Sequence, residues 1–327
     1  MLTHPANLVF LLTLFLSMLI SVSANSWFMV WLGLEINLLS FIPLLTHKKN
    51  KYSSESALKY FLTQAFASML IMICALLALN KNVSYFLLLF AFLLKAGAAP
   101  SHQWMPSMVD GLSWNMIILL MTAQKLVPLV LIFYLCKTHS MYNFISVYIV
   151  FSAIIGSIGG LNQYSLRKIL TYSSISHMSW MLMSMQSKAW LWCMYFVMYS
   201  WVLISLILLL SQANAYNLSH IITLNKSYLS MILALSLMSL GGLPPFTGFV
   251  PKLMVVQDMF TNPNMILALP LLIGTFLSLF FYIRVVFTNL LLSSSSVLLY
   301  KPVKMSMSAL MINLVGLLTP SVFLIYF

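Results

Sequence analysis

Long apolar stretches alternate with short polar connectors along most of the chain. A helix of roughly 17–25 apolar residues can cross the hydrocarbon core of a membrane, and these stretches lack the polar face of a soluble helix. The pattern therefore predicts an all-α integral membrane protein of about eleven transmembrane helices in one transmembrane domain. They are expected near residues 7–22, 26–45, 57–79, 84–105, 112–135, 142–160, 169–186, 189–212, 228–258, 265–290 and 306–326.

Composition supports this class. Hydrophobic residues make up 62% of the 327 residues and charged residues 6%, whereas soluble domains are about half apolar and about a quarter charged. The net charge of +12 comes from basic residues spread over short loops. Because these residues form neither a basic domain nor an aromatic platform, no binding of nucleic acid is expected.

The basic loops also predict an orientation. If the chain has eleven helices, most of the basic loops lie on the same side of the membrane as the N-terminus. The positive-inside rule then places the N-terminus inside. The basic residues on that side are Lys48, Lys49, Lys51, Arg167, Lys168, Lys226, Lys301 and Lys304, against Lys81, Lys137 and Lys188 on the other.

Two apolar stretches are broken by the same spacing of glycine and proline. "KAGAAPSHQWMP" begins at Lys95, and "LGGLPPFTGFVPK" follows about 145 residues later. The shared spacing is Gly-x-x-Pro-x5-Pro, formed by Gly97, Pro100 and Pro106 and again by Gly242, Pro245 and Pro251. Proline removes a backbone donor and clashes with the preceding turn, so the fourth and ninth helices are each predicted to be interrupted near mid-membrane.

An offset of five helices reverses the direction in which each repeat crosses the membrane. The spacing therefore predicts approximate inverted repeats, residues 1–138 and 139–290, followed by a final helix at 306–326. Paired broken helices in opposed halves are typical of a transport site near the bilayer midplane. The alternative is that two proline kinks resemble each other by chance.

Four ionisable residues lie far from the predicted helix ends or at the breaks: Glu35, Lys95, Lys125 and Lys252. Each such charge costs about 2.5–3.5 kcal/mol to insert, so each is expected to have a use. Burial favours the neutral form of a lysine and a nearby carboxylate favours its charged form, so small movements switch its protonation. The four are predicted to transfer protons, whereas snorkelling to the interface is the alternative and is the preferred reading for Lys59.

Other ionisable residues allow more than one role. His177, in "SSISHMSWM", and His102, inside the first break, are candidate proton relays, or else histidines that only hydrogen-bond to a neighbouring helix. Asp110 and Asp258 lie close to predicted helix ends, where solvated or capping roles are expected. Arg284 stays charged at ordinary pH, which favours anchoring or pairing.

The sequence contains no recognisable cofactor or metal motif. Cys74, Cys136 and Cys193 sit singly in separate apolar stretches, without the spacing of a zinc or iron–sulfur site. No glycine-rich nucleotide fingerprint follows a strand. No cofactor-binding and no metal-binding residue is therefore expected in this chain.

Several of these motifs together resemble the family of subunit two of mitochondrial NADH:ubiquinone oxidoreductase, respiratory complex I. The resemblance rests on "NSWFMVWLGLEINLLSFIPLL", "ALKYFLTQAFAS", "LLKAGAAPSHQWMP", "TAQKLVPL", "GGLNQYSLRKILTYSSISHMSWM" and "LMSLGGLPPFTGFVPK". The chain departs from the family at "PSHQW", where an aromatic commonly precedes the histidine, and at Ala123, where a tryptophan is common. Both departures affect how water packs around the lysines more than which groups titrate.

The resemblance implies an antiporter-like fold that pumps protons in the inner mitochondrial membrane, with the N-terminus in the matrix. It implies that Glu35 and Lys95 form a control pair, that Lys125 is the central carrier, and that Lys252 faces the exit half-channel. It also implies that NADH, FMN, iron–sulfur clusters and ubiquinone bind to partner subunits, and that this chain contacts other subunits of complex I and membrane lipids.

Two other functions remain open from the sequence. One is a free-standing sodium/proton antiporter of the same fold, which would exchange ions without redox chemistry. The other is a structural subunit that keeps the fold but moves no protons.

Overall fold

The computed structural model describes residues 5–46, 50–76, 81–136, 141–222, 227–261 and 265–292. The predicted final helix, 306–326, lies outside these ranges. Six of the basic residues used to predict orientation also lie outside them: Lys48, Lys49, Lys137, Lys226, Lys301 and Lys304.

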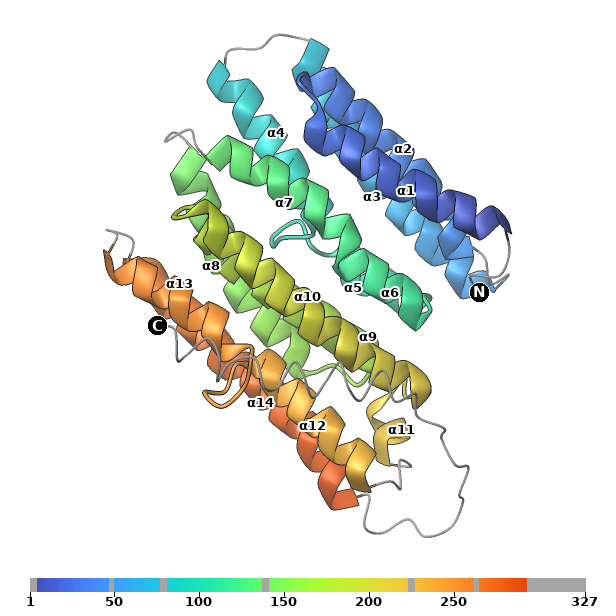
Figure 1. The fold of residues 1–327 in the computed structure, drawn as a ribbon, viewed down its shortest axis with the longest axis vertical. Helices are drawn as coiled ribbons and strands as arrows, with labels where there is room; N and C mark the ends of the chain where they lie inside the picture. The colour runs from blue at the N-terminus through green and yellow to red at the C-terminus, as the bar shows by residue number, and fades with distance from the viewer. Residues whose placement is uncertain are drawn as a thin grey trace. The chain divides into compact units, whose positions relative to one another are not determined.

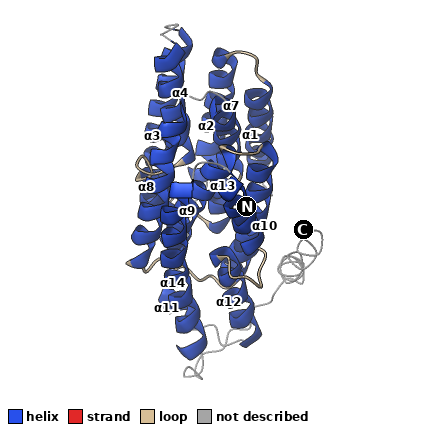
Figure 2. Ribbon diagram, turned by 90° about the vertical axis from the view of Figure 1, so that its left-hand side faces the viewer, coloured by secondary structure: helices blue, strands red, loops and turns tan. Residues whose placement is uncertain are grey.

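Helices joined by short loops make up the described residues, which contain no strand beyond an isolated bridge between Ser165 and Asn217 (Figure 2). The helices are α1 (Pro5–Ser23), α2 (Trp27–Thr46), α3 (Lys51–Leu76), α4 (Lys81–Ala96), α5 (Trp104–Val109), α6 (Trp114–Met121), α7 (Ala123–Cys136), α8 (Tyr142–Leu161), α9 (Leu166–Met185), α10 (Ala189–Gln212), α11 (Leu218–Ile222), α12 (Ser227–Gly241), α13 (Phe249–Thr261), the 3-10 helix η2 (Met265–Leu267) and α14 (Ala268–Leu292).

Seven described segments are long and apolar enough to cross a membrane. They are Pro5–Ser23, Trp27–Thr46, Lys51–Leu76, Trp114–Cys136, Tyr142–Leu161, Ala189–Gln212 and Met265–Thr288. Shorter apolar segments, Val83–Ala96 and Ser230–Gly241, come just before the two breaks. The predicted all-α, multi-span membrane fold is thereby confirmed.

α9 is not among the seven, although it is 20 residues long. It carries several serines and His177, and almost all of its side chains are buried. It contacts α10, α13 and α14, so protein and not lipid covers these polar groups.

α3 begins at Lys51, earlier than the predicted start at residue 57. The hydrophobic pattern could not reveal this polar first turn. Lys59 pairs with Glu55 four residues before it, at 2.7 Å, and both side chains are substantially exposed. Such a pair supports a helix beyond its apolar stretch.

The contacts between residues divide the chain into two compact units, Met1–Ile145 and Ser146–Phe327. In the first unit α1, α2 and α3 pack in chain order, and α4 contacts both α3 and α7 (Figure 1). A Cβ at Gly33 would lie 2.9 Å from the Cβ of Ser21, so glycine permits the close approach of α2 to α1.

In the second unit α10 packs against α9, α12 and α13, while α14 contacts α9, α11 and α12. Arg284 of α14 donates hydrogen bonds to the backbone carbonyls of Leu161 and Gln163, the second at 2.8 Å. These carbonyls lie at and just beyond the C-terminal end of α8, where a cation is favourable. Arg284 therefore ties α14 to the end of α8, and its anchoring or pairing role stays a prediction.

Both predicted breaks are present, and both begin with the same backbone turn. At the first, Gly97 has φ of +73°, its N–H donates to the carbonyl of Leu94, and the N–H of Ala98 donates to the carbonyl of Leu93. Two such bonds around a left-handed residue form a Schellman motif, which ends a helix and satisfies its last carbonyls.

At the second break Gly242 has φ of +79° and donates to the carbonyl of Ser239, and Leu243 donates to that of Met238. Only glycine adopts this conformation without strain. The first half of each broken helix thus ends at its glycine, ahead of the prolines to which the sequence pattern attributed the break.

The second proline of each motif lies in a following helix. Pro106 is the third residue of α5 and Pro251 is the third residue of α13. A proline in the first turn removes no helical hydrogen bond, because the first four N–H groups have no partner within the helix. The repeated spacing therefore consists of a glycine that ends one helix and a proline that fits the start of the next.

A third interruption was not predicted. α6 ends at Met121 and α7 begins at Ala123, with Thr122 at φ −113° and ψ −78° between them. Pro128, inside α7, has no N–H to donate to the carbonyl of Gln124 and crowds the turn before it. The irregular residue, Thr122, precedes Pro128 by six positions.

Candidate functional site

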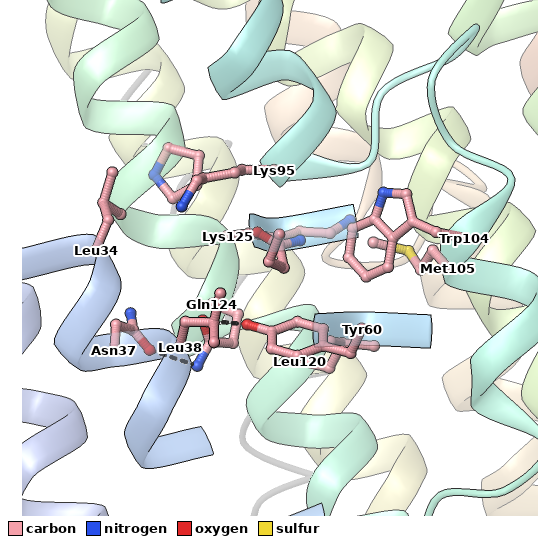
Figure 3. Close-up of a pocket in the computed structure, with 12 residues that line it drawn as sticks. Leu34, Asn37, Leu38, Tyr60, Lys95, Trp104, Met105, Leu120, Gln124 and Lys125 are labelled. Atoms are coloured by element: carbon pink, nitrogen blue, oxygen red, sulfur yellow. Dashed lines mark hydrogen bonds between the residues drawn. The ribbon is translucent and has the colours of Figure 1, made fainter. Parts of the chain in front are cut away.

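A polar cavity lies inside the first unit, and Figure 3 shows the residues that line it. Its lining comes from α2, α3, α4, α5, α6 and α7. The polar members are Asn37, Tyr60, Gln64, Lys95, Gln124 and Lys125. The cavity leaves about 20 Å³ for the centres of water molecules, and roughly 10–15 Å³ of such space holds one water.

Two predicted site residues, Lys95 and Lys125, both line this cavity (Figure 3). Lys95 lies in the last turn of α4 and is 7% exposed, while Lys125 lies in the first turn of α7 and is 1% exposed. Neither amine reaches a lipid-facing surface, so the snorkelling alternative is wrong for both. Each lysine adjoins an interrupted helix, where freed backbone groups can hydrogen-bond to polar side chains or water.

Glu35 occupies the middle of α2 and is the carboxylate that acts electrostatically on Lys95. It does not line the cavity itself, although its neighbour Leu34 does. Its Oε2 atom is buried without a hydrogen-bond partner among the described residues. The control pair of Glu35 with Lys95 stays a prediction.

Hydrogen bonds join three further side chains across the cavity, and the sequence analysis did not identify them. The hydroxyl of Tyr60 donates to Gln124 Oε1 at 3.3 Å, and Gln124 Nε2 donates to Asn37 Oδ1 at 2.8 Å. These bonds connect α3, α7 and α2 (Figure 3). The available signal was a set of polar residues in apolar helices, but partners 64 and 87 positions apart cannot be paired from one sequence.

Trp104 connects the first break to the cavity wall. Its indole N–H donates to the carbonyl of Leu94 at 3.1 Å, next to Lys95 in the chain. Its ring lies 6.0 Å from that of Tyr60, which in turn lies 5.1 Å from that of Phe41. This aromatic contact holds α5, the short helix after the break, against α3, whose Tyr60 packs in turn against α2.

His102 lies within the first break and is 7% exposed. Its Nδ1 is 3.1 Å from the carbonyl oxygen of Pro100. It does not line the cavity that contains Lys95 and Lys125. A relay role for His102 stays a prediction.

The fourth predicted residue, Lys252, lies at the second break, in the second unit. It is 8% exposed and donates a 2.7 Å hydrogen bond from Nζ to the carbonyl of Gly241, the last residue of α12. The ammonium therefore lies at the negative end of the α12 dipole, across the break from its own helix α13.

Lys252 and His177 line one cavity in the second unit. Hydroxyl groups contribute much of its polar lining, from Ser176, Ser179 and Ser278. It leaves about 10 Å³ for water centres, which is near the lower limit for one water.

His177 is held in place by a neighbouring tyrosine. Its Nδ1 is 2.8 Å from the hydroxyl of Tyr195, and its ring lies 5.0 Å from that of Tyr199. Hydrogen bonding to a neighbouring helix, one of the two predicted readings, is thus present. A proton-relay role for His177 stays a prediction.

The two aspartates differ from each other. Asp110 is the exposed C-cap residue of α5, as its place near a helix end suggested. Asp258 is 8% exposed and pairs with Lys188 at 3.4 Å, so the expectation of a solvated Asp258 is wrong. Its position near the end of α13 was correct, but the side chain is buried and pairs with the residue just before α10.

The described residues contain no group of three or more histidine, cysteine, aspartate or glutamate side chains that could hold a metal ion. The chemistry that the site offers is therefore that of buried amines, a carboxylate, hydroxyls and water-sized cavities. Such groups transfer protons, and paired broken helices are the usual frame for them in membrane transporters. The fold and the site together define an antiporter-like membrane protein.

Comparison with known proteins shows which family of this class the chain is similar to. Residues 24–280 match the family described as NADH:quinone oxidoreductase/Mrp antiporter, TM. NADH-ubiquinone oxidoreductase chain 2 of Anopheles gambiae is 42% identical over 301 residues, which cover 88% of this chain and 87% of that protein. The chain 2 protein of Locusta migratoria is 37% identical over 302 residues, covering 89% and 87%.

Solved structures show the same fold. A chain of respiratory complex I from Thermus thermophilus with bound aureothin superposes with a TM-score of 0.85 at 20% identity, covering 96% of this chain and 77% of that one. A chain of the Mrp complex from Dietzia sp. DQ12-45-1b gives a TM-score of 0.77 at 17% identity, covering 91% and 61%. The protein belongs to the NADH-ubiquinone oxidoreductase chain 2 family, within the wider NADH:quinone oxidoreductase/Mrp antiporter family.

Proposed function

We propose that this chain is an antiporter-like, proton-translocating core subunit of the membrane arm of NADH:ubiquinone oxidoreductase. Electron transfer from NADH to ubiquinone takes place in partner subunits, and this chain couples it to proton movement. The observation that carries the proposal is the burial of Lys95 and Lys125, 7% and 1% exposed, in one water-sized cavity beside interrupted helices.

The four ionisable residues have distinct roles. Glu35 and Lys95 form a control pair, because movement of the carboxylate toward or away from the amine changes which form of the lysine is favoured. Lys125, the most deeply buried of the three lysines among them, is the central carrier. Lys252 delivers the proton toward the exit, with His177, which lines the same cavity, as a relay.

The chain itself holds no redox centre. NADH, FMN, iron–sulfur clusters and ubiquinone bind to partner subunits. The single, separated cysteines and the lack of a nucleotide fingerprint in the sequence support this assignment. Coupling then reaches this chain as conformational and electrostatic change.

The proposed location is the inner mitochondrial membrane, with the N-terminus in the matrix. The positive-inside rule and the names of the relatives support it. Residues 1–138 and 139–290 are proposed as inverted repeats, because each contains one helix broken by the same glycine and proline spacing.

The test measures the proton-to-electron ratio of the whole complex in sealed vesicles. Lys125→Ala and Lys95→Ala are each expected to lower the ratio, because removal of a buried carrier interrupts the path. Lys59→Ala, which removes a partly exposed lysine paired with Glu55, serves as the control and is expected to leave it unchanged. An unchanged ratio in assembled Lys125→Ala complex would assign the chain a bracing role, whereas sodium uptake without electron transfer would identify an independent antiporter.

A further inference from the structure

Gln124, in the first unit, has no role in the proton transfer proposed above, although it is hydrogen-bonded to two other helices. It is the second residue of α7, directly before Lys125 and just after the irregular residue Thr122. Its amide accepts from Tyr60 of α3 at 3.3 Å and donates to Asn37 of α2 at 2.8 Å. One side chain thus ties the start of α7 to two other helices.

The first turn of α7 needs such support. The N–H of Lys125 donates to the carbonyl of Thr122 at 3.1 Å, three residues back as in a 3-10 turn, where hydrogen-bond geometry is poorer than in an α-helix. The carbonyl of Gln124 receives no helical bond from position 128, because that residue is Pro128. The turn that carries Lys125 is therefore less well defined by its own backbone than an ordinary helical turn.

The partners of Gln124 are themselves firmly placed. Asn37 is 5% exposed and Tyr60 is 3% exposed. The ring of Tyr60 packs against those of Phe41 and Trp104, at 5.1 and 6.0 Å. Polar side chains buried at such points are costly to leave unpaired, so the two hydrogen bonds specify one arrangement of the three helices.

An amide is a poor proton carrier, because it neither gains nor loses a proton at ordinary pH. A direct role of Gln124 in the proton path is therefore not supported by its chemistry. Its two bonds instead define where the adjacent Lys125 enters the cavity that it shares with Lys95.

We propose that Gln124 is a positioning residue for proton transfer. Its side-chain amide, held between Tyr60 and Asn37, fixes the first turn of α7 and so the direction of Lys125. This inference rests on the proposed function of Lys125 and adds a residue that acts through it.

The experiment uses the assembled complex in sealed vesicles. It measures how many protons are pumped per electron, how fast they are pumped, and how both quantities depend on pH. Gln124→Leu removes both hydrogen bonds at similar volume. We expect pumping to slow by about tenfold and its pH profile to shift, since misplacing a reacting group by about 1 Å can cost about a hundredfold. Gln257→Leu is the control, because Gln257 of α13 is exposed and does not line the cavity that Lys95 and Lys125 share.

If the complex that carries Gln124→Leu fails to assemble, exchanging the amide side chains of Gln124 and Asn37 provides a second test. Gln124→Asn and Asn37→Gln each alter the length of one partner, and the double variant restores the combined length. We expect both single variants to pump slowly and the double variant to recover. A purely structural role would lower the amount of assembled complex but leave pumping per complex and its pH profile unchanged, which would overturn the proposal.

Lys125→Ala, measured alongside, separates the two claims. If that variant pumps normally, the proposed function of Lys125 fails. If it lowers pumping while Gln124→Leu and the exchanged pair behave like Gln257→Leu, only the positioning role fails.

Discussion

Lys252 holds the broken end of the helix before it: its ammonium donates to the carbonyl of Gly241 at 2.7 Å. The neighbouring Gly242 makes this contact possible, since a Cβ there would lie 2.9 Å from both Cδ and Nζ of the lysine. A residue proposed to carry protons thus also contributes to the geometry of the break in which it lies. Its protonation and the position of α13 are expected to depend on each other.

Gly242→Ala tests this dependence. The substitution forces a side chain into the left-handed region, at a cost of about 1–2 kcal/mol, and displaces Lys252. Lower thermal stability and a lower proton-to-electron ratio are both expected. Gly97→Ala is the matched control: it carries the same backbone strain at φ +73°, but its Cβ would meet the flexible end of Met105. An unchanged ratio in Gly242→Ala would show that Lys252 tolerates displacement.

Trp104→Phe removes the hydrogen bond to the carbonyl of Leu94 while keeping an aromatic ring. That carbonyl still accepts from Gly97 at 3.1 Å, so the expected loss of stability is modest, about 1 kcal/mol. Thermal unfolding of the complex measures it. Trp190→Phe, at a site that is 46% exposed, is expected to change stability little. A loss as large in the control would remove any special role for the indole N–H.

Lys188→Ala separates Asp258 from a cation that lies 3.4 Å away. Because Asp258 is buried and lies near the negative end of α13, we expect a cost of about 1 kcal/mol, above that of a typical surface pair. The double variant Lys188→Ala with Asp258→Asn is expected to recover part of the loss, since a neutral amide needs no counter-charge. Additive effects in this double-mutant cycle would contradict the pairing.

Pro128→Ala returns an N–H to the turn that precedes it and allows α7 to bond normally to the carbonyl of Gln124. Stability is expected to rise by roughly 1 kcal/mol, while pumping falls because a regular turn redirects Lys125. Stability and proton-to-electron ratio are measured on the same vesicles. Pro43→Ala, in the last turn of α2, is the control and is expected to leave the ratio unchanged. Normal pumping by Pro128→Ala would mean that the irregular turn has no part in placing Lys125.

The broken helices illustrate how far sequence reasoning reached. The repeated glycine and proline spacing predicted two interruptions, and both are present. The pattern did not distinguish the residue that ends the helix from the one that fits the next helix, because both glycine and proline are helix breakers. Backbone angles at Gly97 and Gly242 resolve this point.

For the site, too, the sequence revealed some of the residues and not others. Lys95, Lys125 and Lys252 were recognisable because a charge in an apolar stretch is costly wherever the helix lies. Gln124 was not, because an amide in such a stretch is common enough to pass unnoticed. Its importance comes from partners on α2 and α3 that the sequence places far away.

The sequence by itself determined the class of protein, the approximate spans, the two breaks and the buried lysines. These follow from hydropathy, from proline and glycine geometry, and from the cost of burying charge, all of which act locally along the chain. Only the tertiary structure decided that Asn37 bonds to Gln124, that Lys188 pairs with Asp258 and that Lys252 shares a cavity with His177. Those contacts depend on how each helix is rotated and packed against its neighbours, which no local pattern specifies.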